Sequence, residues 1–351
     1  MGPTAEQIAE RRSGYQAELA KGLDRFFEPR RTTCPWCESP RLTRRLRTPD
    51  VVQSKPGTFT VDQCGECSHS FQNPRLNVDG LDFYYQDFYD GLGEGEAGGC
   101  FGSGPNRDRY RTSARALARV ARPQRWLDVG TGHGHFPQVA KEVLPQTSFD
   151  GLDMTDGVER AAAEGRIDEG HRGLFPELAP GMAGRYDAVS MFHYLEHSTE
   201  PRAELAAART VLRPGGHLMI EVPNPESGFS KLLGKWWIPY MQPQHLHLIP
   251  AANLCRELEG LGYTVVAAER KEAHMPVDLM MSLLLFLQHH VPGADRAWGP
   301  RPNRLVRRFR KALFALALPF LMGLFALDRL LAPLVRRTGF ANAYRVIARR
   351  E

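Results

Sequence analysis

The stretch Trp126-Leu127-Asp128-Val129-Gly130-Thr131-Gly132-His133-Gly134-His135-Phe136 decides the fold of this chain. An apolar run ends in an acid, and three glycines follow at alternate positions. The pattern predicts a strand, a tight turn and the start of a helix. Glycine lacks the Cβ that would keep a ligand away from the backbone of such a turn. Because many α/β nucleotide-binding folds carry a glycine-rich turn, we expect an adenosine-containing ligand, with a turn that binds no ligand as the alternative.

The segments after this turn alternate between strand and helix patterns. Short apolar runs predict strands, and the segments between them space their apolar residues as helices do. The alternation predicts an α/β fold with a doubly wound, mostly parallel sheet, which binds ligands at the carboxyl ends of its strands. The predicted strands are 125–128, 149–153, 171–174, 186–191 and 217–222, and the predicted helices are 135–143, 157–163 and 202–212.

Two acids narrow the choice of ligand at the glycine turn. Asp153 ends the second predicted strand about 20 residues after the turn, where an acid can accept hydrogen bonds from both ribose hydroxyls of an adenosine cofactor. Asp128 precedes the turn, and the glycines follow the spacing G-x-G-x-G and not G-x-G-x-x-G. An acid beside the turn disfavours a pyrophosphate and suits a cation such as an amino group.

Four cysteines ahead of this region form two C-x-x-C pairs, Cys34 with Cys37 and Cys64 with Cys67. Four thiolates from two tight knuckles can surround one tetrahedral zinc ion, and residues 58–61 between them alternate like a strand. The spacing predicts a zinc ribbon. Four protein ligands leave no open coordination position, so we expect the zinc to be structural. A pair of redox-active dithiols is the alternative.

The successive motifs of the second half resemble those of class I S-adenosylmethionine-dependent methyltransferases. The resemblance covers about 114–270 and a closing strand near 344–348, and it rests on 128–134, Asp153, Tyr186-Asp187 and 212–216. The cysteine module in front is similar to that of bacterial, small-molecule members with an N-terminal zinc-binding module. The resemblance implies a Rossmann-like fold that binds S-adenosylmethionine. It implies that Gly130, Gly132 and Gly134 cradle the methionine part, that Asp153 holds the ribose and that Met154 packs on the adenine, and we expect Asp128, Met191 and Phe192 to complete the cofactor site.

The candidate catalytic residues follow the fourth predicted strand. His193, Glu196 and His197 are spaced i, i+3 and i+4, so they share one face if the segment is helical. The segment resembles the E-x-x-E-H of ubiquinone-pathway O-methyltransferases, in which both acids and the histidine bind a divalent metal, but His193 replaces the first acid. A direct base, a metal site and a structural Glu196–His197 pair all remain open. The segment does not resemble the N/D-P-P-Y/F turn of methyltransferases that act on nucleic-acid bases.

An aromatic insertion follows the fifth predicted strand. It contains Trp236-Trp237-Ile238-Pro239-Tyr240-Met241 and Gln244-His245-Leu246-His247, and the family's substrate pocket usually forms here. The insertion suits an aromatic or lipidic acceptor, or it forms a loop that caps the core. His245 is the second candidate for the catalytic base.

A further insertion precedes the closing strand. A basic run at 301–311 leads into the apolar segment 312–327, which Asp328 and Arg329 interrupt. A membrane-spanning helix needs about 20 apolar residues, so this segment is too short. The basic flank beside an apolar helix fits a membrane-surface anchor. A helical hairpin over the substrate pocket and a homodimer interface are the alternatives.

These observations predict four parts for the chain of 351 residues. They are an N-terminal helix (1–31), a zinc ribbon (32–76), an aromatic helix with a glycine-rich lid or linker (77–113) and a methyltransferase domain (114–351) with a helical insertion at about 277–338. The polar start of the sequence is not a secretory signal peptide, and the cysteine pairs suit a reducing compartment. We therefore expect a cytoplasmic protein, with peripheral contact to the inner face of the membrane as one option.

The expected reaction is S-adenosylmethionine-dependent O-methylation of an apolar, lipidic or glycosylated small molecule. N- or C-methylation of a natural product or sugar is the first alternative. An RNA methyltransferase that stacks bases on Trp36 of the ribbon is the second, and a binding protein without catalysis is the third. The net charge of +5 is mild and does not by itself indicate nucleic acid, which we do not expect as a partner.

Overall fold

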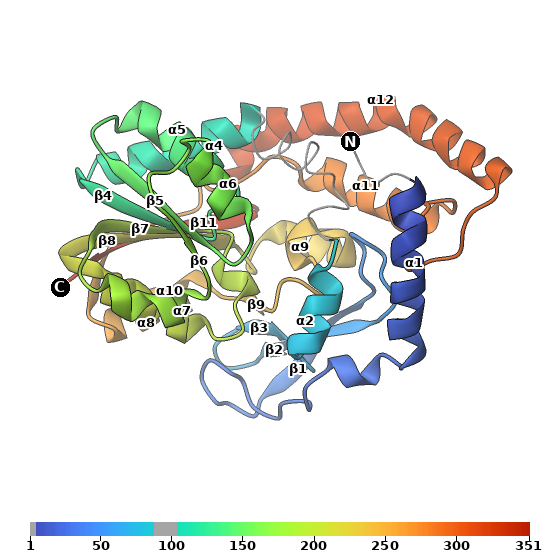
Figure 1. The fold of residues 1–351 in the computed structure, drawn as a ribbon, viewed down its shortest axis with the longest axis horizontal. Coiled ribbons are helices and arrows are strands. Elements are labelled where there is room, and N and C mark those ends of the chain that lie inside the picture. The colour runs from blue at the N-terminus through green and yellow to red at the C-terminus, as the bar shows by residue number, and fades with distance from the viewer. Residues whose placement is uncertain (1–4, 88–103) are drawn as a thin grey trace. The chain divides into compact units, whose positions relative to one another are not determined.

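The computed structural model describes residues 5–87 and 104–351 (Figure 1). The chain divides into two compact units. The first combines Met1–Ala97, Gly228–Leu246 and Pro276–Val335, and the second combines Gly98–Ser227, His247–Met275 and Arg336–Glu351. Each unit therefore contains segments that are far apart in the sequence.

The second unit is built on a seven-stranded sheet with the order β10-β11-β8-β7-β4-β5-β6. The neighbours from β8 to β6 pair in parallel, whereas β11 pairs antiparallel with both β8 and β10. The predicted doubly wound, mostly parallel fold is confirmed. The strands are β4 (Arg125–Val129), β5 (Ser148–Asp153), β6 (Gly170–Arg172), β7 (Tyr186–Phe192), β8 (Leu212–Pro223), β10 (Tyr263–Glu269) and β11 (Ala343–Arg350).

Helices connect these strands because apolar residues recur at helical spacing between them. Trp126 of β4 and Phe149 of β5 are fully buried and pack with Phe136 of α5 in the main core of this unit. The helices are α4 (Gly104–Ala118), α5 (His135–Val143), α6 (Gly157–Ala163), α7 (Phe175–Leu178), α8 (Pro201–Val211) and α10 (Ala251–Gly260), with 3₁₀ turns at Ala179–Met182 and Leu195–His197.

A buried ionic network joins β8, β11 and α4. Arg345 and Glu221 are both fully buried, and Arg345 Nε donates to Glu221 Oε1 over 2.7 Å. Arg109 Nη1 donates to the other oxygen of Glu221 over 3.0 Å, and Ser113 Oγ donates to Glu221 Oε1 over 2.6 Å. Burial opposes ionisation of Glu221, but the charges of Arg345 and Arg109 outweigh it and lower the pKa of this carboxyl group. The network ties the last strand of the chain to the middle of the sheet.

The first unit begins with α1 (Ala5–Ala20) and a 3₁₀ turn at Asp24–Phe26, and its strands β1 (Leu42–Thr48), β2 (Phe59–Cys64) and β3 (Ser70–Gln72) pair antiparallel in that order. Its core contains Tyr15, Phe26, Phe59 and Tyr84. The other elements are α2 (Val78–Tyr85), α9 (Gly228–Leu232), the 3₁₀ turns Gly234–Trp236 and Ile238–Tyr240, α11 (Asp278–His290) and α12 (Arg304–Val335); β9 (His247–Leu248) falls in the second unit.

The buried side chain of Lys55 caps the carboxyl end of α2 in the first unit. Its ammonium group donates to the carbonyl oxygens of Phe83 over 2.6 Å and Gln86 over 2.5 Å, so it satisfies carbonyls that the helix end leaves unpaired. Burial lowers the pKa of Lys55 to about 8.

Most of the predicted glycine-rich lid or linker falls on residues 88–103, which lie outside the described part of the chain.

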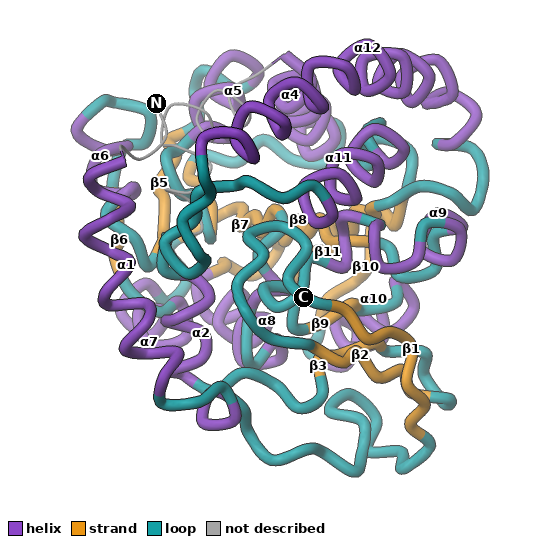
Figure 2. Tube along the Cα trace, turned by 90° about the vertical axis from the view of Figure 1, so that its right-hand side faces the viewer, coloured by secondary structure: helices purple, strands orange, loops and turns teal. Residues whose placement is uncertain are grey.

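The two helices of the C-terminal insertion lie side by side in both views (Figures 1 and 2). The carboxylate of Asp328 in α12 accepts the backbone N–H groups of Leu279 and Met280, at 3.1 and 3.0 Å. These N–H groups belong to the first turn of α11, so the one acid of α12 caps the neighbouring helix.

Candidate active site and cysteine cluster

The glycine turn between β4 and α5 needs residues without a side chain at more than one position. Gly130, Gly132 and Gly134 have φ values of 73°, 51° and 70°. A Cβ on Gly130 would come within 2.6 Å of Tyr194 Cδ2, whereas a Cβ on Gly132 would meet no atom within 4 Å. The backbone at Gly132 is therefore open on the side where a ligand would approach, and only its conformation demands glycine there.

Asp153 lies at the end of β5 and faces this turn. Its Oδ2 accepts the backbone N–H of Gly132 over 2.9 Å, and its Oδ1 accepts the backbone N–H and the hydroxyl of Thr155, at 2.9 and 2.8 Å. The carboxylate is thus held rigidly at the carboxyl edge of the sheet. Met154 beside it is 64% exposed, so its side chain is available to pack on a planar ring.

Asp128 is the buried acid of the site. Ser190 Oγ donates to Asp128 Oδ1 over 2.6 Å and accepts the indole N–H of Trp126 over 2.9 Å. Burial raises the pKa of Asp128 to about 7, although the hydrogen bond from Ser190 acts in the opposite direction. A carboxyl group with this pKa can accept a cationic partner at neutral pH by releasing its proton.

The end of β7 continues the same edge of the sheet, because Met191 pairs with Val129 of β4 in parallel register. Met191 is fully buried, so its side chain belongs to the interior of the sheet. Phe192 is half-buried and packs on Phe136 at a ring-centroid distance of 4.4 Å and on Tyr110 at 6.3 Å.

His193 and Glu196 form a hydrogen-bonded pair directly after β7. His193 Nδ1 lies 3.0 Å from Glu196 Oε1, and Glu196 is 1% exposed. His193 Nε2 has no hydrogen-bond partner among the described residues. A histidine held in this way presents its second ring nitrogen as a proton acceptor, because the carboxylate takes the N–H at Nδ1.

His193, Glu196 and His197 do not share one face of a helix, because His193 lies outside the helical turn. The 3₁₀ turn covers only Leu195–His197, and His193 precedes it with φ 50°. A positive φ is strained for a residue with a side chain and is found preferentially at functional sites. The backbone N–H of His193 donates to Glu221 O over 2.9 Å, which holds the residue in this conformation. His197, at the end of the turn, is half-buried.

Four residues that support the site have no distinctive sequence motif. Tyr194 contacts the glycine turn, and its hydroxyl donates to Glu204 Oε2 over 3.0 Å, while Ser198 Oγ donates to Glu204 Oε1 over 3.1 Å. Ser190 meets Asp128 because the two are paired in the register of β7 and β4. Only the strand register reveals the pair of Ser190 and Asp128, since 62 residues separate them.

His245 and the paired tryptophans belong to the first unit. His245 is 5% exposed, and its Nδ1 lies 2.7 Å from the carbonyl oxygen of Pro239. Trp237 is fully buried, and its indole N–H donates to Asp278 Oδ1 over 2.9 Å, whereas Trp236 is half-buried beside Phe286. Trp237 thus caps a core, and a catalytic role for His245 stays a prediction.

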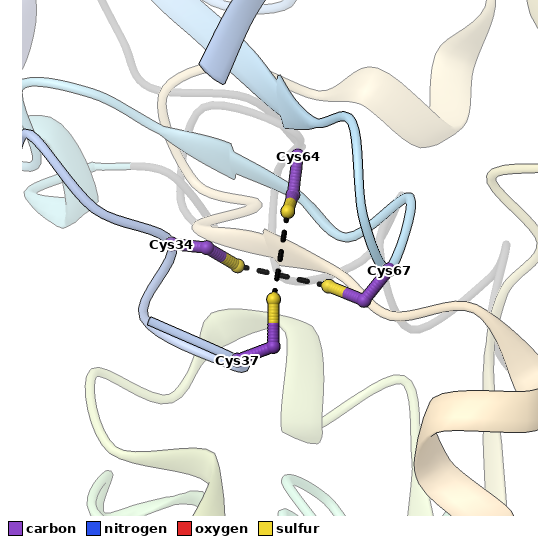
Figure 3. Close-up of side chains that lie close together, drawn as sticks. All are labelled: Cys34, Cys37, Cys64 and Cys67. Atoms are coloured by element: carbon purple, nitrogen blue, oxygen red, sulfur yellow. Dashed lines mark hydrogen bonds between the residues drawn. The ribbon is translucent and has the colours of Figure 1, made fainter. Parts of the chain in front are cut away.

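The four cysteine sulfurs of the first unit converge on a common point (Figure 3). All four Sγ atoms lie within 4.8 Å of one another, with Cys34–Cys67 at 3.7 Å and Cys37–Cys64 at 3.5 Å. A tetrahedron with Zn–S bonds of about 2.3 Å has edges of about 3.8 Å. The donor set and its spacing therefore fit a zinc ion, and the two S–S distances join cysteines from different C-x-x-C pairs.

Trp36 between the first two cysteines is not exposed as a stacking platform. It is 9% exposed and packs on His69 at a ring-centroid distance of 5.3 Å. The RNA alternative expected Trp36 to stack on bases. That expectation is wrong, because the indole is part of the ribbon's own packing.

Comparison with known proteins relates the second unit to methyl-transfer enzymes. Residues 106–268 match a family described as "Methyltransferase domain". The ubiquinone biosynthesis O-methyltransferase of Acinetobacter baumannii (strain AYE) is 27% identical over 154 residues, which cover 40% of this chain and 63% of that protein. The enzyme of the same name from Marinobacter nauticus is 28% identical over 166 residues, 41% of this chain and 69% of that protein.

Among solved structures, a putative sarcosine dimethylglycine methyltransferase from Galdieria sulphuraria covers 70% of this chain and 85% of its own, with 16% identity and a TM-score of 0.44. The chain spans slightly less than two thirds of the length of the first curated relative. The matched segment contains the glycine turn, Asp153 and the end of β7. The chain carries, at residues 106–268, a class I S-adenosylmethionine-dependent methyltransferase domain.

Proposed function

We propose that this protein transfers the methyl group of S-adenosylmethionine to a hydroxyl group of a small, apolar, lipidic or glycosylated acceptor. The observation that carries the proposal is the His193–Glu196 pair, with a 3.0 Å contact at Nδ1 and an unpartnered Nε2 after β7. A hydroxyl group needs a base when it is methylated, and a histidine is suited to that role near neutral pH. The curated relatives are O-methyltransferases by name, which supports oxygen as the acceptor atom.

The cofactor supplies an electrophilic methyl group on a positively charged sulfur. Gly130, Gly132 and Gly134 hold its methionine part, Asp128 pairs with its amino group, and Asp153 accepts the ribose hydroxyls. Met154 would pack on the adenine and Phe192 would close the site from β7, whereas the expected contact from Met191 is not part of this proposal because its side chain is fully buried in the sheet. Asp153 already accepts three hydrogen bonds in this structure, two of them through Oδ1 from Thr155, so the ribose hydroxyls would reach its remaining lone pairs.

His193 would accept the proton of the acceptor hydroxyl at Nε2, while the methyl group passes from the cofactor sulfur to the acceptor oxygen and S-adenosylhomocysteine leaves. Glu196 stabilises the imidazolium that forms, because its carboxylate lies at Nδ1 and is shielded from water. The contact between Nδ1 and Glu196 orients the ring of His193. His197 and His245 are the alternative bases, and a divalent metal held by His193, Glu196 and His197 is the alternative arrangement.

The cysteine cluster is proposed to hold a structural zinc ion that stabilises the ribbon. Its four thiolates would fill a tetrahedral coordination shell and leave no position for substrate. Zinc-bound thiolates in this arrangement suit a reducing compartment, so we infer a cytoplasmic protein.

The proposal is tested with His193→Gln in an assay that measures S-adenosylhomocysteine release with hydroxyl, amine and carbon acceptors. The loss of the base should reduce kcat by about 10²- to 10⁴-fold, with little change in cofactor affinity. Glu196→Gln should reduce kcat as well, and His217→Gln on β8 is the matched control. Full activity of His193→Gln, with loss in His197→Gln or His245→Gln, would reassign the base. Turnover of amine or carbon acceptors alone would refute O-methylation, and activity that depends on added Mg²⁺ or Mn²⁺ would favour the metal arrangement.

A further inference from the structure

Helix α12 has an outer face that the protein leaves uncovered. The apolar segment that the sequence predicts to be too short for a span lies within the 32 residues of α12, whose length and hydropathy suffice to cross a membrane. Among the described helices α12 meets this criterion, and only 6% of its most apolar window is buried. The most exposed apolar side chains include Leu316 and Phe320, each 70% exposed, Met322 at 57% and Leu330 at 76%. No charged residue lies between Lys311 and Asp328, so this outer face is continuously apolar over several turns.

The opposite face of α12 packs on the protein. Leu321 is 8% exposed, Asp328 is 5% exposed and Ala332 is 6% exposed. These positions are spaced seven and four residues apart and fall on one side of the helix. Because Asp328 caps α11 from this side, the acid of α12 is directed away from the outer face. The helix therefore has a fixed orientation, and its outer face is a defined surface.

A row of basic residues borders the outer face. At about 100° per residue, Arg304, Lys311 and Arg329 fall within about 20° of one another on the helix circumference. All three are exposed, and in sequence Arg336-Arg337 follows directly after the helix. Six basic residues and one acid lie on α12, so the helix is strongly positive. An apolar face with an arginine and lysine border is the pattern of a helix that lies in the headgroup region of a membrane.

The topology of the sheet argues against a single membrane crossing by α12. The chain continues from α12 into β11, which pairs with β8 on one side and β10 on the other. A single crossing would separate β11 from both neighbours. Helix α11 has 13 residues and rises only about 20 Å, too short to cross back through a hydrocarbon core of about 30 Å.

We propose that the outer face of α12 binds the surface of an anionic phospholipid bilayer, as a peripheral contact that lies parallel to the membrane. The apolar side chains enter the boundary between headgroups and acyl chains, and the basic row contacts lipid phosphates. Charge complementarity favours this occupant over a second copy of the chain, whose α12 would bring an equally positive row. The inference is independent of the methyl acceptor, but it places the protein where a lipidic acceptor would be found.

The test is co-sedimentation of the full-length protein with vesicles of phosphatidylcholine that contain phosphatidylglycerol, beside vesicles of phosphatidylcholine alone. We expect binding to the mixed vesicles that weakens as salt rises. The double variant Leu316→Glu/Phe320→Glu should lower the partition coefficient at least tenfold. Lys311→Glu/Arg329→Glu should lower it on mixed vesicles and leave the residual binding to neutral vesicles unchanged. Leu232→Glu is the matched control, because Leu232 is 69% exposed on α9.

Three results would overturn the proposal. The first is no binding to mixed vesicles at low salt. The second is a homodimer in sedimentation velocity that Leu316→Glu/Phe320→Glu dissociates, with no vesicle binding by the wild type. The third is retention in the membrane fraction after alkaline carbonate extraction, which indicates an integral span. Titration of S-adenosylhomocysteine into each variant shows that the methyltransferase domain is intact and separates this proposal from the proposed reaction.

Discussion

The substitution Asp128→Asn should make the protein more stable and its cofactor binding weaker. Asp128 is 4% exposed, and burial raises its pKa to about 7 from an ordinary 3.8. Asparagine has nearly the same shape, and its Oδ1 can still accept the hydrogen bond from Ser190. The substitution therefore removes a buried charge and keeps the geometry.

The effect on stability follows from the shift in pKa. A raised pKa means that the folded state holds the proton more tightly than the unfolded state, so stability is highest at low pH and falls as the pH rises towards 7. Above pH 7 the full cost of the buried carboxylate is about 4 kcal/mol, at 1.36 kcal/mol per pKa unit. Asp128→Asn should raise the free energy of unfolding of the ligand-free protein by up to about 4 kcal/mol at pH 8. The gain should be about 1 kcal/mol smaller at pH 6.

Cofactor affinity should change in the opposite direction. If Asp128 pairs with the amino group of the cofactor, binding requires the ionised carboxylate. With a pKa of about 7, the ionised fraction falls about tenfold between pH 8 and pH 6, and the affinity of the wild type should fall by the same factor. In Asp128→Asn this contribution is absent, and only the titration of the ligand's own amine remains.

The assay combines urea unfolding with calorimetric titration of S-adenosylhomocysteine at pH 6, 7 and 8. Asp150→Asn is the control, because Asp150 is fully buried one strand away but is paired with Arg125 and Tyr186. It should lose stability and leave the pH dependence of binding unchanged. An Asp128→Asn protein that binds the ligand as tightly as the wild type at pH 8 would refute the pairing with the amino group. A loss of stability at pH 8 would refute the buried, raised-pKa carboxylate.

Three further predictions concern the ribose site, the zinc site and the ionic network. Asp153→Ala should weaken S-adenosylhomocysteine about 100-fold, since two charge-assisted hydrogen bonds contribute roughly 3 kcal/mol, and unchanged affinity in calorimetry would exclude the ribose role. Cys34→Ser should reduce the bound zinc and lower the melting temperature without changing kcat; absence of zinc from freshly purified wild type, measured by mass spectrometry, would rule out the site. Arg345→Ala should cost about 3–5 kcal/mol in urea unfolding, because Glu221 would be left buried with less compensating charge, whereas the exposed Arg349→Ala on the same strand should cost less than about 1 kcal/mol; equal effects would contradict the network.

Much of the fold and of the candidate site could be predicted from local patterns. The glycines at 130, 132 and 134 report a backbone conformation that side chains disfavour, and the structure gives all three a positive φ. The C-x-x-C spacing predicts the four-sulfur cluster because each knuckle brings its two thiols together within a few residues. Asp153 could be placed because a strand end fixes the position of an acid at the edge of a parallel sheet.

The tertiary structure alone decided the features that depend on distant partners. The pKa of Asp128 depends on its burial beside Ser190, and the backbone conformation of His193 depends on a hydrogen bond to the carbonyl oxygen of Glu221. Trp36 is the stacking platform of the RNA alternative, and the insertion with Trp237 suits either an acceptor pocket or a core-capping loop, but packing buries both indoles. The amino-acid pattern thus determined the elements and the cofactor class, because these follow from local backbone and periodicity. The protonation of Asp128, the geometry of the base and the uncovered face of α12 were decided by burial, which arises only when segments far apart in the chain pack together.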